Sequence, residues 1–590
     1  MGLLGRTPSA LRLAAAISGV LTVPTTYLMG RAWFTKRIGL LSAAILTTTY
    51  WHVHLSRVGF RAVTLPLVIA LTLWATGKAF QSRRRHMWLL AGILYGTSFY
   101  TYVAARFTPI VLLALITYLL LKGQGDRLWP AIGYFSAGAF VILLPLGIHT
   151  LTHWDVVMGR PGQVSVFNPL IHGGDAAGTI GRQLLRTLGM FFVRGDTIPR
   201  HNLPGRPVFD PFTASAMILG IGLAVVRARR GDFASGLALI WVGLMMVPTW
   251  MAEDAPHFLR AVGILPVVVV LPALGLDALM NWLETPRWRV WALAMIGGVL
   301  LIGLAKTVRD YFVRYPSRPE TRYAFEDAAV DLATEINTFL GTGWQGDGIT
   351  ASTPPGRLDR HVFLDRRVWE EWTSTAFLIP QTGQQTLFPP DDPPTPTEPA
   401  MVVVWPHDGI RRYADALPRR SRITAEAGPL TRGDLEETPY TAYVVYHVVP
   451  EAKPPATSIA IFDDGIALIG YALEPAGDTS EVTLEWMALD APEADYTVSV
   501  RLFDDSDLVA QSDAEPGDGY YPTGLWREGD LVEDRHTLEF VWDGLDDARL
   551  EVGLYVWPTM EHLGARSPEG DPLGTWLSLP VPESGHDGHE

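Results

Sequence analysis

Arginine and histidine side chains gather at one boundary of a predicted membrane span. The segment 50–61, which reads YWHVHLSRVGFR, ends the second apolar stretch of the chain and contains His52, His54, Arg57 and Arg61. Ionisable groups in such a place are costly unless they serve a function. Because a guanidinium matches phosphate oxygens, Arg57 and Arg61 are candidate phosphate ligands. Interfacial anchoring by snorkelling is the alternative for this pair, and a structural role is favoured for the two histidines.

A second polar group lies in the segment 151–209, which is too long for a plain connector. Its middle part has apolar residues at helical spacing, which predicts an amphipathic helix in the membrane interface around 180–192. The turn at 195–207 that follows is rich in groups able to bind a substrate. These groups are Asp196, Arg200, His201 and Asn202. We interpret this turn as a substrate loop, with an ordered loop that caps the next span as the alternative.

A third group precedes a later apolar stretch. Arg260 stands at the start of that stretch and is the strongest single candidate for binding an anionic headgroup. Glu253 and Asp254 have the chemistry of a divalent-cation ligand or a general base, although a solvated loop is the favoured interpretation. We therefore assign no residue as a metal ligand. A divalent cation is the one cofactor that the sequence leaves open as an alternative. The chain has no Cys, which excludes disulfides and thiolate chemistry.

The elements that must position these residues are membrane helices. Ten apolar stretches are candidate spans: 10–29, 38–54, 62–80, 88–104, 107–121, 128–150, 210–226, 234–251, 260–282 and 290–306. One set of short loops holds 14 Lys and Arg residues, whereas the alternate set holds 4. The positive-inside rule places the first set in the cytoplasm, so 151–209 and everything after 307 are predicted to lie outside.

The same rule places Met1 outside, and residues 1–9 contain no signal peptide. A chain that begins outside normally follows an earlier span. We therefore expect a further helix and its outer loop upstream of the sequence given.

Charge divides the 590 residues into two halves. Residues 1–309 carry a net charge of +18 and residues 310–590 one of −32, while the mean hydropathy of the whole is +0.17. This pattern excludes a single soluble globule, a disordered chain and a basic nucleic-acid binder. We predict a multi-pass α-helical membrane domain at 1–309, a small α/β domain at 310–449 and an all-β sandwich at 450–590.

The soluble half supplies further expectations. A helix is predicted at about 323–341, and strands at 361–364, 401–405 and 440–449. Seven short strand-like runs follow between 458 and 557. Four tryptophans in this part invite a carbohydrate-stacking interpretation, although a role in the sandwich core is favoured. They are Trp486, Trp526, Trp542 and Trp557.

Several segments together resemble a known family. They read RTPSALRL at 6–13, YLMGR at 27–31, SRVGFR at 56–61, GDTIPRHN at 195–202 and PHFLRAVG at 256–263. In order and spacing, over about residues 5–310, they resemble the C-type superfamily of lipid-dependent membrane glycosyltransferases. Within that superfamily, the pattern is similar to the protein O-mannosyltransferases and the bacterial aminoarabinose transferases.

The resemblance implies transfer of a sugar from a polyprenyl-phosphate donor to a protein, lipid or glycan acceptor on the outer face of the cell membrane. It implies that Arg57, Arg61 and Arg260 contact the phosphate or its carrier. Contacts with the acceptor or its loop would come from Asp196, Arg200, His201 and Asn202.

The family's principal carboxylate lies in the outer loop between its first two helices. Because this chain begins at what resembles the second helix, we assign no catalytic residue, and the chain as given is expected to lack that carboxylate. Many relatives also carry an Asp shortly after the segment that matches Arg57, where this chain has Arg61 and Ala62. Metal use by the family route is therefore not predicted.

Two other functions compete with this hypothesis. A transporter or flippase of lipid-linked sugars would place ionisable groups near the bilayer midplane, and most predicted span interiors are uncharged. A non-catalytic envelope protein would bind glycans through its sandwich.

Overall fold

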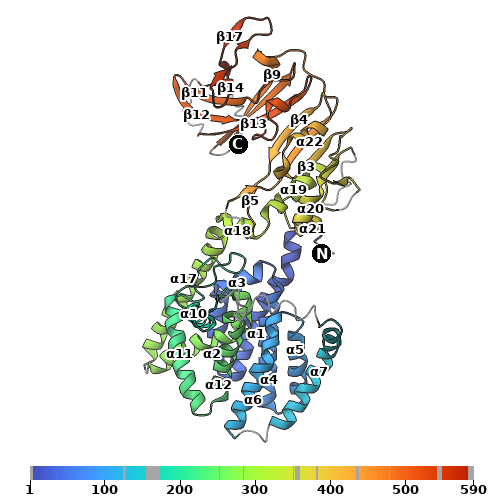
Figure 1. Cartoon of the computed structure of the whole chain (residues 1–590). Coiled ribbons are helices and arrows are strands. Elements are labelled where there is room, and N and C mark those ends of the chain that lie inside the picture. The colour runs from blue at the N-terminus through green and yellow to red at the C-terminus, as the bar shows by residue number, and fades with distance from the viewer. Residues whose placement is uncertain are drawn as a thin grey trace. The chain divides into compact units, whose positions relative to one another are not determined.

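The chain forms two compact units. The computed structural model describes residues 4–123, 128–154, 173–251, 253–283, 285–349, 351, 359–380, 383–433, 438–476, 479–540 and 548–581. A helical unit comprises Pro8–Phe325, and a β unit comprises Glu326–Glu590 together with Met1–Thr7. Each unit is described by itself below (Figure 1).

The helical unit follows the apolar stretches of the sequence. Its helices are α1 (Pro8–Trp33), α2 (Lys36–Thr48), α3 (Tyr50–Arg57), α4 (Thr64–Ser82), α5 (Arg85–Ser98), α6 (Thr108–Leu121), α7 (Leu128–Thr152), α10 (Ala176–Gly189), α11 (Pro211–Arg229), α12 (Phe233–Met245), α13 (Val247–Trp250), α14 (Phe258–Ala261), α15 (Leu265–Val268), α16 (Val270–Trp282), α17 (Pro286–Arg309) and α18 (Pro319–Ala324). A π-helical turn, Asp310–Arg314, continues α17.

Eight helical segments within the described part of the chain are long and apolar enough to cross a membrane. They are Pro8–Trp33, Arg61–Ser82, Val103–Leu121, Ala131–Thr152, Pro211–Arg229, Phe233–Trp250, Phe258–Trp282 and Arg287–Arg314. The two remaining predicted stretches form shorter helices. Helix α5 has 14 residues, and the predicted span 38–54 is divided between α2 and α3.

Thr49 causes that division. Its backbone is extended (φ −75°, ψ 116°), and its side-chain hydroxyl donates to the carbonyl of Ile45 at 2.7 Å. The polar segment with the two histidines therefore forms its own short helix, α3, after the apolar part of the stretch has ended.

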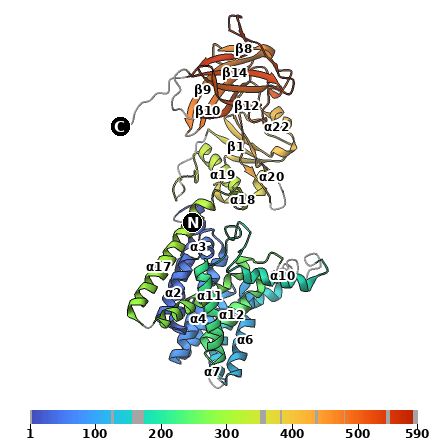
Figure 2. The same cartoon turned by 90° about the vertical axis from the view of Figure 1, so that its left-hand side faces the viewer.

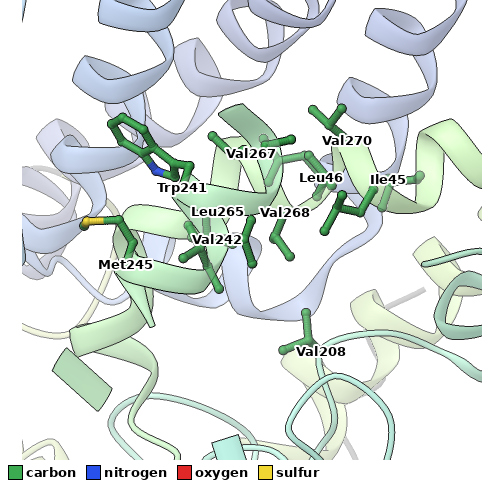
Figure 3. Close-up of a cluster of buried hydrophobic side chains, with 14 of the residues drawn as sticks. Ile45, Leu46, Val208, Trp241, Val242, Met245, Leu265, Val267, Val268 and Val270 are labelled. Carbon is green, nitrogen blue, oxygen red and sulfur yellow. The ribbon is translucent and has the colours of Figure 1, made fainter. Parts of the chain in front are cut away.

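Small residues allow the central helices to pack closely. A Cβ on Gly220 of α11 would lie 1.8 Å from the carbonyl oxygen of Leu271 in α16, so only glycine fits there. The span Phe258–Trp282 is the most enclosed, with 89% of its apolar window buried. Its valines and leucines pack against Trp241, Val242 and Met245 of α12 (Figure 3).

Helix α10 confirms the predicted amphipathic segment, with bounds at 176–189. Its buried residues are the polar Thr179, Gln183 and Thr187, whereas Leu185 on the opposite side is 72% exposed. Figure 2 shows this helix extending sideways from the bundle. Among the described residues, nothing covers the apolar face around Leu185, as expected for a helix that lies in a membrane interface.

The β unit is built on an eleven-stranded sheet. Its strand order is β17-β16-β8-β9-β10-β13-β4-β7-β3-β1-β2. The bounds are β17 (Pro572–Gly574), β16 (Ala565–Arg566), β8 (Ala460–Phe462), β9 (Ile466–Ala476), β10 (Thr479–Ala488), β13 (Leu531–Glu539), β4 (Arg422–Ala427), β7 (Val444–Val449), β3 (Ala400–Val404), β1 (His361–Asp365) and β2 (Gln385–Phe388).

A smaller five-stranded sheet packs on one half of the large sheet. It contains β12 (Asp507–Ala514), β11 (Thr497–Asp504), β14 (Ala548–Val556), β15 (Glu561–His562) and β18 (Leu577–Pro580). Apolar residues from both sheets form one buried cluster between them, which is the core of a β-sandwich. Two short strands, β5 (Leu430–Thr431) and β6 (Tyr440–Thr441), pair with each other elsewhere in the unit.

Helices cover the other half of the large sheet. They are α19 (Asp327–Leu340), α20 (Arg366–Glu371), α21 (Thr373–Leu378) and α22 (Arg411–Ala416). A second buried cluster lies between α19 and strands β1, β3 and β7. The predicted helix at 323–341 is interrupted at Glu326, whose φ of 54° is left-handed, so α18 and α19 are separate helices.

The two predicted soluble domains share this large sheet. Strand β13 pairs in parallel with β4, from Leu531 opposite Arg422 to Glu533 opposite Thr424. Before the boundary predicted between 449 and 450, helices pack on the large sheet, and after it the smaller sheet packs on the large sheet. The large sheet itself continues across this boundary.

The tryptophans have different environments. Trp486 and Trp526 are fully buried in the sandwich core, which agrees with the favoured structural interpretation. Trp557 is exposed, and Trp542 lies outside the described residues.

Candidate functional site

Helix α3 places the predicted histidines inside the protein and its arginine outside. His52 Nε2 lies 3.2 Å from the carbonyl oxygen of Gly19, and His54 Nε2 lies 3.0 Å from that of Arg200. Both histidines are buried and bonded to backbone, which supports the structural interpretation favoured for them. Arg57 ends the helix and is exposed, with its guanidinium over the rings of Tyr311 and Phe312 at 5.1 Å and 4.9 Å.

Asp196 organises the loop at 195–206. Its Oδ1 accepts from the backbone N–H of Ile198 at 2.8 Å. Its Oδ2 accepts from the backbone N–H of Phe258 at 2.7 Å and lies 3.1 Å from Nδ1 of His201. The carboxylate is almost completely buried. Asp196 therefore joins this loop to the N-terminus of the span that starts at Phe258.

Asn202 closes the same loop from within. Its Nδ2 donates to the backbone carbonyls of Asp196 at 3.0 Å and Arg206 at 2.8 Å. A Cβ on Gly195 would lie 2.0 Å from the carbonyl oxygen of Arg206, so this close crossing of the two loop ends requires glycine. The loop is thus an internally bonded turn, and Asn202 is one of its buried parts.

His257 connects the loop to Arg260. The imidazole ring of His257 lies against that of His201, with centroids 4.5 Å apart, and its Nδ1 caps helix α14 by accepting from the N–H of Arg260 at 3.4 Å. Burial, together with the nearby His201 and Arg260, lowers the pKa of His257 to about 2. This ring is therefore neutral at physiological pH.

Arg260 has one nitrogen without a partner. Its Nη1 is buried and makes no hydrogen bond to any residue that the structure describes. An unpaired buried guanidinium nitrogen is unfavourable unless an anion satisfies it. Of the predicted site residues, Arg260 thus has the strongest structural argument for ligand binding.

A divalent cation does not fit the buried trio of Asp196, His201 and His257. One potential ligand atom from each lies within 4.8 Å of the others. However, both oxygens of Asp196 already accept backbone N–H groups, and Nδ1 of His257 already caps α14. A cation that took Nδ1 of His257 as a ligand would displace the cap of α14, so we derive no chemistry through a metal here.

A buried ion pair that sequence reasoning missed supports the loop from its other end. Arg206 Nη1 lies 3.3 Å from Oδ2 of Asp310, its Nη2 donates to Thr307, and its guanidinium covers the ring of Tyr50 at 4.4 Å. Asp310 also pairs with Arg314 at 3.0 Å. A carboxylate directly after an apolar span, as at Asp310, is the sequence signal that could have found this pair.

The remaining predicted residues are on the surface. Arg61 is exposed, and exposed Arg200 donates through Nε to the carbonyl of Ala324 at 2.7 Å. Glu253 and Asp254 are exposed, in agreement with the favoured solvated-loop interpretation. The backbone carbonyl of Glu253 accepts from Gln183 of α10 at 3.3 Å.

The structure thus brings the three predicted groups to one end of the helical bundle. The ring of Phe60, next to Arg61, lies 6.1 Å from that of His201, and His201 in turn packs on His257 beside Arg260. The carbonyl of Arg200 lies within hydrogen-bonding distance of His54, three residues before Arg57. We call this region, comprising α3, the loop 195–206 and α14, the loop end. Its exposed arginines and its half-buried Arg260 can bind an anionic group.

Fold and site together define a polytopic membrane protein with an arginine-rich site at one end of its helices. Residues 1–149 match the family of dolichyl-phosphate-mannose-protein mannosyltransferases. The matched segment contains helices α1 to α6, most of α7, and both Arg57 and Arg61. Among curated proteins, none is similar enough in sequence to match.

Solved structures of two membrane enzymes are similar to the chain at low identity. ArnT from Cupriavidus metallidurans, bound to undecaprenyl phosphate, has 14% identity and a TM-score of 0.43, over 75% of this chain and 85% of that one. The oligosaccharyltransferase AglB from Archaeoglobus fulgidus, in complex with an inhibitory peptide and a dolichol-phosphate, has 11% identity and a TM-score of 0.38, over 98% and 86%. Over residues 1–149, the family match confirms the predicted resemblance to the protein mannosyltransferases.

Proposed function

We propose that the chain is an integral membrane glycosyltransferase that moves a sugar from a polyprenyl-phosphate donor to an acceptor at the outer face of the membrane. The observation that carries the proposal is the guanidinium of Arg260 at the loop end. Its Nη1 is buried and has no hydrogen-bond partner among the residues that the structure describes. The family match over residues 1–149 supplies the class of donor.

Arginine suits the leaving group of this reaction. When the acceptor's nucleophile attacks the anomeric carbon, the bond between that carbon and the phosphate oxygen breaks, and the carrier phosphate gains negative charge. A guanidinium that binds two of its oxygens stabilises this charge as it develops. We assign this role to Arg260, with Arg57 and Arg61 as contacts to the carrier phosphate.

The loop 195–206 positions Arg260 rather than acting as a base. Asp196 is buried, accepts bonds from the backbone N–H groups of Ile198 and Phe258 and lies beside His201, so its carboxylate serves to bond the loop. Asp196, His201 and Asn202 therefore hold the start of the span that carries Arg260. Arg200, which is exposed, is the member of this loop that remains able to contact an acceptor. We assign no catalytic carboxylate.

The sidedness of the proposal rests on the sorting of basic residues. The loop end is opposite the ends of the helices that carry Arg83, Arg84 and Arg85, which the positive-inside rule places in the cytoplasm. The β unit follows α17 and would then also lie outside. A protein, lipid or glycan acceptor would reach the site from that side.

The test is sugar transfer in membranes that contain the protein expressed from its whole gene, so that any upstream coding segment is included. Labelled polyprenyl-phosphate sugars are supplied as donors, and transfer is compared for the parent chain, Arg260→Gln, Arg260→Lys and Arg287→Gln. Loss of a charge-assisted hydrogen bond costs about 1.5–3 kcal/mol, so Arg260→Gln should lower kcat/KM by about 10- to 150-fold. Arg260→Lys should recover only part of this, because Lys lacks the planar fork.

Arg287→Gln is the matched control. Arg287 is an exposed arginine in the first turn of α17, which is the predicted cytoplasmic end of that helix. Its substitution should leave transfer unchanged. Equal transfer by Arg260→Gln and the parent chain would contradict the role of Arg260, and no transfer from any polyprenyl-phosphate sugar would contradict the proposed activity.

A further inference from the structure

A cavity of about 470 Å³, partly open at the surface, lies among the helices of the helical unit, away from the loop end. Residues from α4, α5, α6, α7 and α12 line it. On α4 the lining runs from Thr72 to Phe80, near the C-terminus of the helix at Ser82, whereas the loop end adjoins the N-terminus of α4. At a rise of about 1.5 Å per residue, these eight steps extend the cavity over roughly 12 Å along α4.

The walls of the cavity are apolar. Leu112, Leu115, Ile116 and Leu119 of α6 form one wall, and aromatic residues from α4, α5, α7 and α12 form much of the rest. Its depth along α4 is most of the roughly 15 Å that one leaflet contributes to a hydrocarbon core of about 30 Å. The shape and depth thus suit a hydrocarbon chain in the adjoining leaflet.

Four polar side chains in these walls, those of Thr72, Thr76, Tyr95 and Trp241, already have hydrogen-bond partners. The hydroxyls of Thr72 and Thr76 donate to the carbonyls of Val68 and Thr72 in their own helix. The hydroxyl of Tyr95 accepts from Thr108 at 3.2 Å, and Nε1 of Trp241 donates to the carbonyl of Gly263 at 3.0 Å. A ligand in this cavity gains little from polar groups of its own, so the chemistry favours an apolar occupant.

Basic residues surround the nearby end of the same helices. Arg83 and Arg84 connect α4 to α5 and are exposed, and Arg85 begins α5 with its guanidinium 5.7 Å from the ring centroid of Tyr134 in α7. Lys122 follows α6 and donates to the carbonyl of Arg229. We call these four residues the basic end. Such clusters at a membrane surface attract anionic lipid headgroups.

We propose that this cavity binds one acyl chain of an anionic glycerophospholipid from the leaflet at the basic end, with the lipid phosphate beside Arg83, Arg84 and Arg85. The site is separate from the proposed transfer reaction, which uses arginines at the opposite end of the bundle. A bound chain fills the space between the α5–α7 pair and the α6–α12 pair, so the lipid stabilises the packing of the bundle.

The position of the cavity decides between two lipid sources. A polyprenyl-phosphate donor used at the loop end would have its phosphate near Arg57 and Arg260, so its chain would enter from that leaflet. A glycerophospholipid of the opposite leaflet places its phosphate at the basic end and its acyl chain directly between Phe80 and Thr72. Charge and depth together therefore favour the glycerophospholipid.

The experiment is photo-crosslinking of the full chain in lipid vesicles. Phosphatidylglycerol and phosphatidylcholine with the same photoactivatable acyl chain are compared with a photoactivatable polyprenyl phosphate, and the labelled residues are mapped by peptide mass spectrometry. The proposal expects phosphatidylglycerol to label Leu112, Ile116 and Leu119 in preference to Leu113, which is on the same helix but 66% exposed and outside the cavity.

A matched pair of variants tests occupancy. Leu112→Trp places an indole in the cavity, and Leu113→Trp places the same group on the outer face of α6. If Leu112→Trp excludes about two methylenes of the chain from burial, labelling of the cavity should fall about tenfold, whereas Leu113→Trp should leave it within about twofold of the parent. Arg84→Gln combined with Arg85→Gln should remove the preference for phosphatidylglycerol.

Several outcomes would overturn the proposal. Equal labelling of the cavity and outer faces of α6 would indicate ordinary surrounding lipid. Equal labelling by phosphatidylcholine would exclude the headgroup contact, and stronger labelling by the polyprenyl phosphate would make the cavity a donor site. If Leu112→Trp does not fold, the residue map of the parent chain still decides among these outcomes.

Discussion

The buried carboxylate of Asp196 should contribute strongly to stability, and Asp196→Asn measures that contribution. An asparagine keeps one acceptor oxygen, which can stay with the N–H of Ile198. Its amide nitrogen then faces the N–H of Phe258, which the carboxylate accepts at 2.7 Å in the parent chain. The side-chain N–H of the asparagine and the backbone N–H of Phe258 would then be two buried donors facing each other. The negative charge that strengthens the bonds from Ile198 and Phe258 would also be lost.

The magnitude follows from these contacts. A buried donor left without a partner costs about 1–3 kcal/mol, and a hydrogen bond to a charged group contributes about 1.5–3 kcal/mol. Asp196→Asn should therefore lower the free energy of unfolding by about 3–5 kcal/mol. Unfolding of the purified protein in detergent, followed by tryptophan fluorescence, measures the loss, and hydrogen exchange at Ile198 and Phe258 locates it.

Asp210→Asn is the control. Asp210 caps α11, with Oδ1 accepting from the N–H groups of Phe212 and Thr213 and Oδ2 accepting from the hydroxyl of Thr213. Asparagine is an equally good cap, and its amide can donate to a hydroxyl, so the change should cost less than about 1 kcal/mol. Equal losses for the two variants, or unchanged exchange at Phe258, would refute the role given to Asp196.

Two further predictions concern the same loop. Gly195→Ala places a Cβ 2.0 Å from the carbonyl oxygen of Arg206, so it should open the loop and lower transfer activity. In Gly222→Ala, the added Cβ meets no described atom within 4 Å, so this control should keep its activity and stabilise α11 by up to about 1 kcal/mol. Equal activity of the two variants would contradict the role given to Gly195. Because the pKa of His257 is lowered from 6.5 to about 2, the unfolded chain binds a proton between these values and the folded chain does not. Above pH 6.5, the ring is neutral in both states and the free energy of unfolding does not depend on it. As the pH falls below 6.5, proton uptake by the unfolded chain lowers the free energy of unfolding, by about 2 kcal/mol at pH 5. His257→Asn, which keeps an acceptor for the N–H of Arg260, should show a weaker loss of stability on acidification, and an unchanged pH dependence would exclude His257 as its source.

The elements of this protein were largely readable from the sequence because they follow local patterns. Apolar runs predicted the helices, and short strand-like runs predicted strands such as β1, β3 and β11. The break at Thr49 was not predicted, because the apolar run 38–54 alone does not show where the backbone leaves the helix. The pairing of β13 with β4 was also not predicted, since it joins residues about a hundred positions apart.

The candidate site was readable in part. Residue type and position next to a span were enough to single out Arg260 and the loop containing Asp196. The bonds that distinguish their roles connect distant segments, as Asp196 and Phe258 are 62 positions apart. Burial then separates Asn202, which holds the loop, from Arg200, which is exposed, although both lie in one short polar turn. Arg206 was missed because its partner Asp310 belongs to another helix.

The central claim is that the loop end and the β unit face outward while the basic end faces the cytoplasm. Because the chain has no native cysteine, single substitutions at exposed serines can report sidedness. The choices are Ser82→Cys at the basic end, Ser317→Cys beyond α17 and Ser506→Cys in the β unit. A membrane-impermeant maleimide applied to intact cells should label the Ser317→Cys and Ser506→Cys variants, and should label the Ser82→Cys variant only after permeabilisation. Labelling of Ser82→Cys in intact cells, with Ser317→Cys and Ser506→Cys protected, would contradict the account.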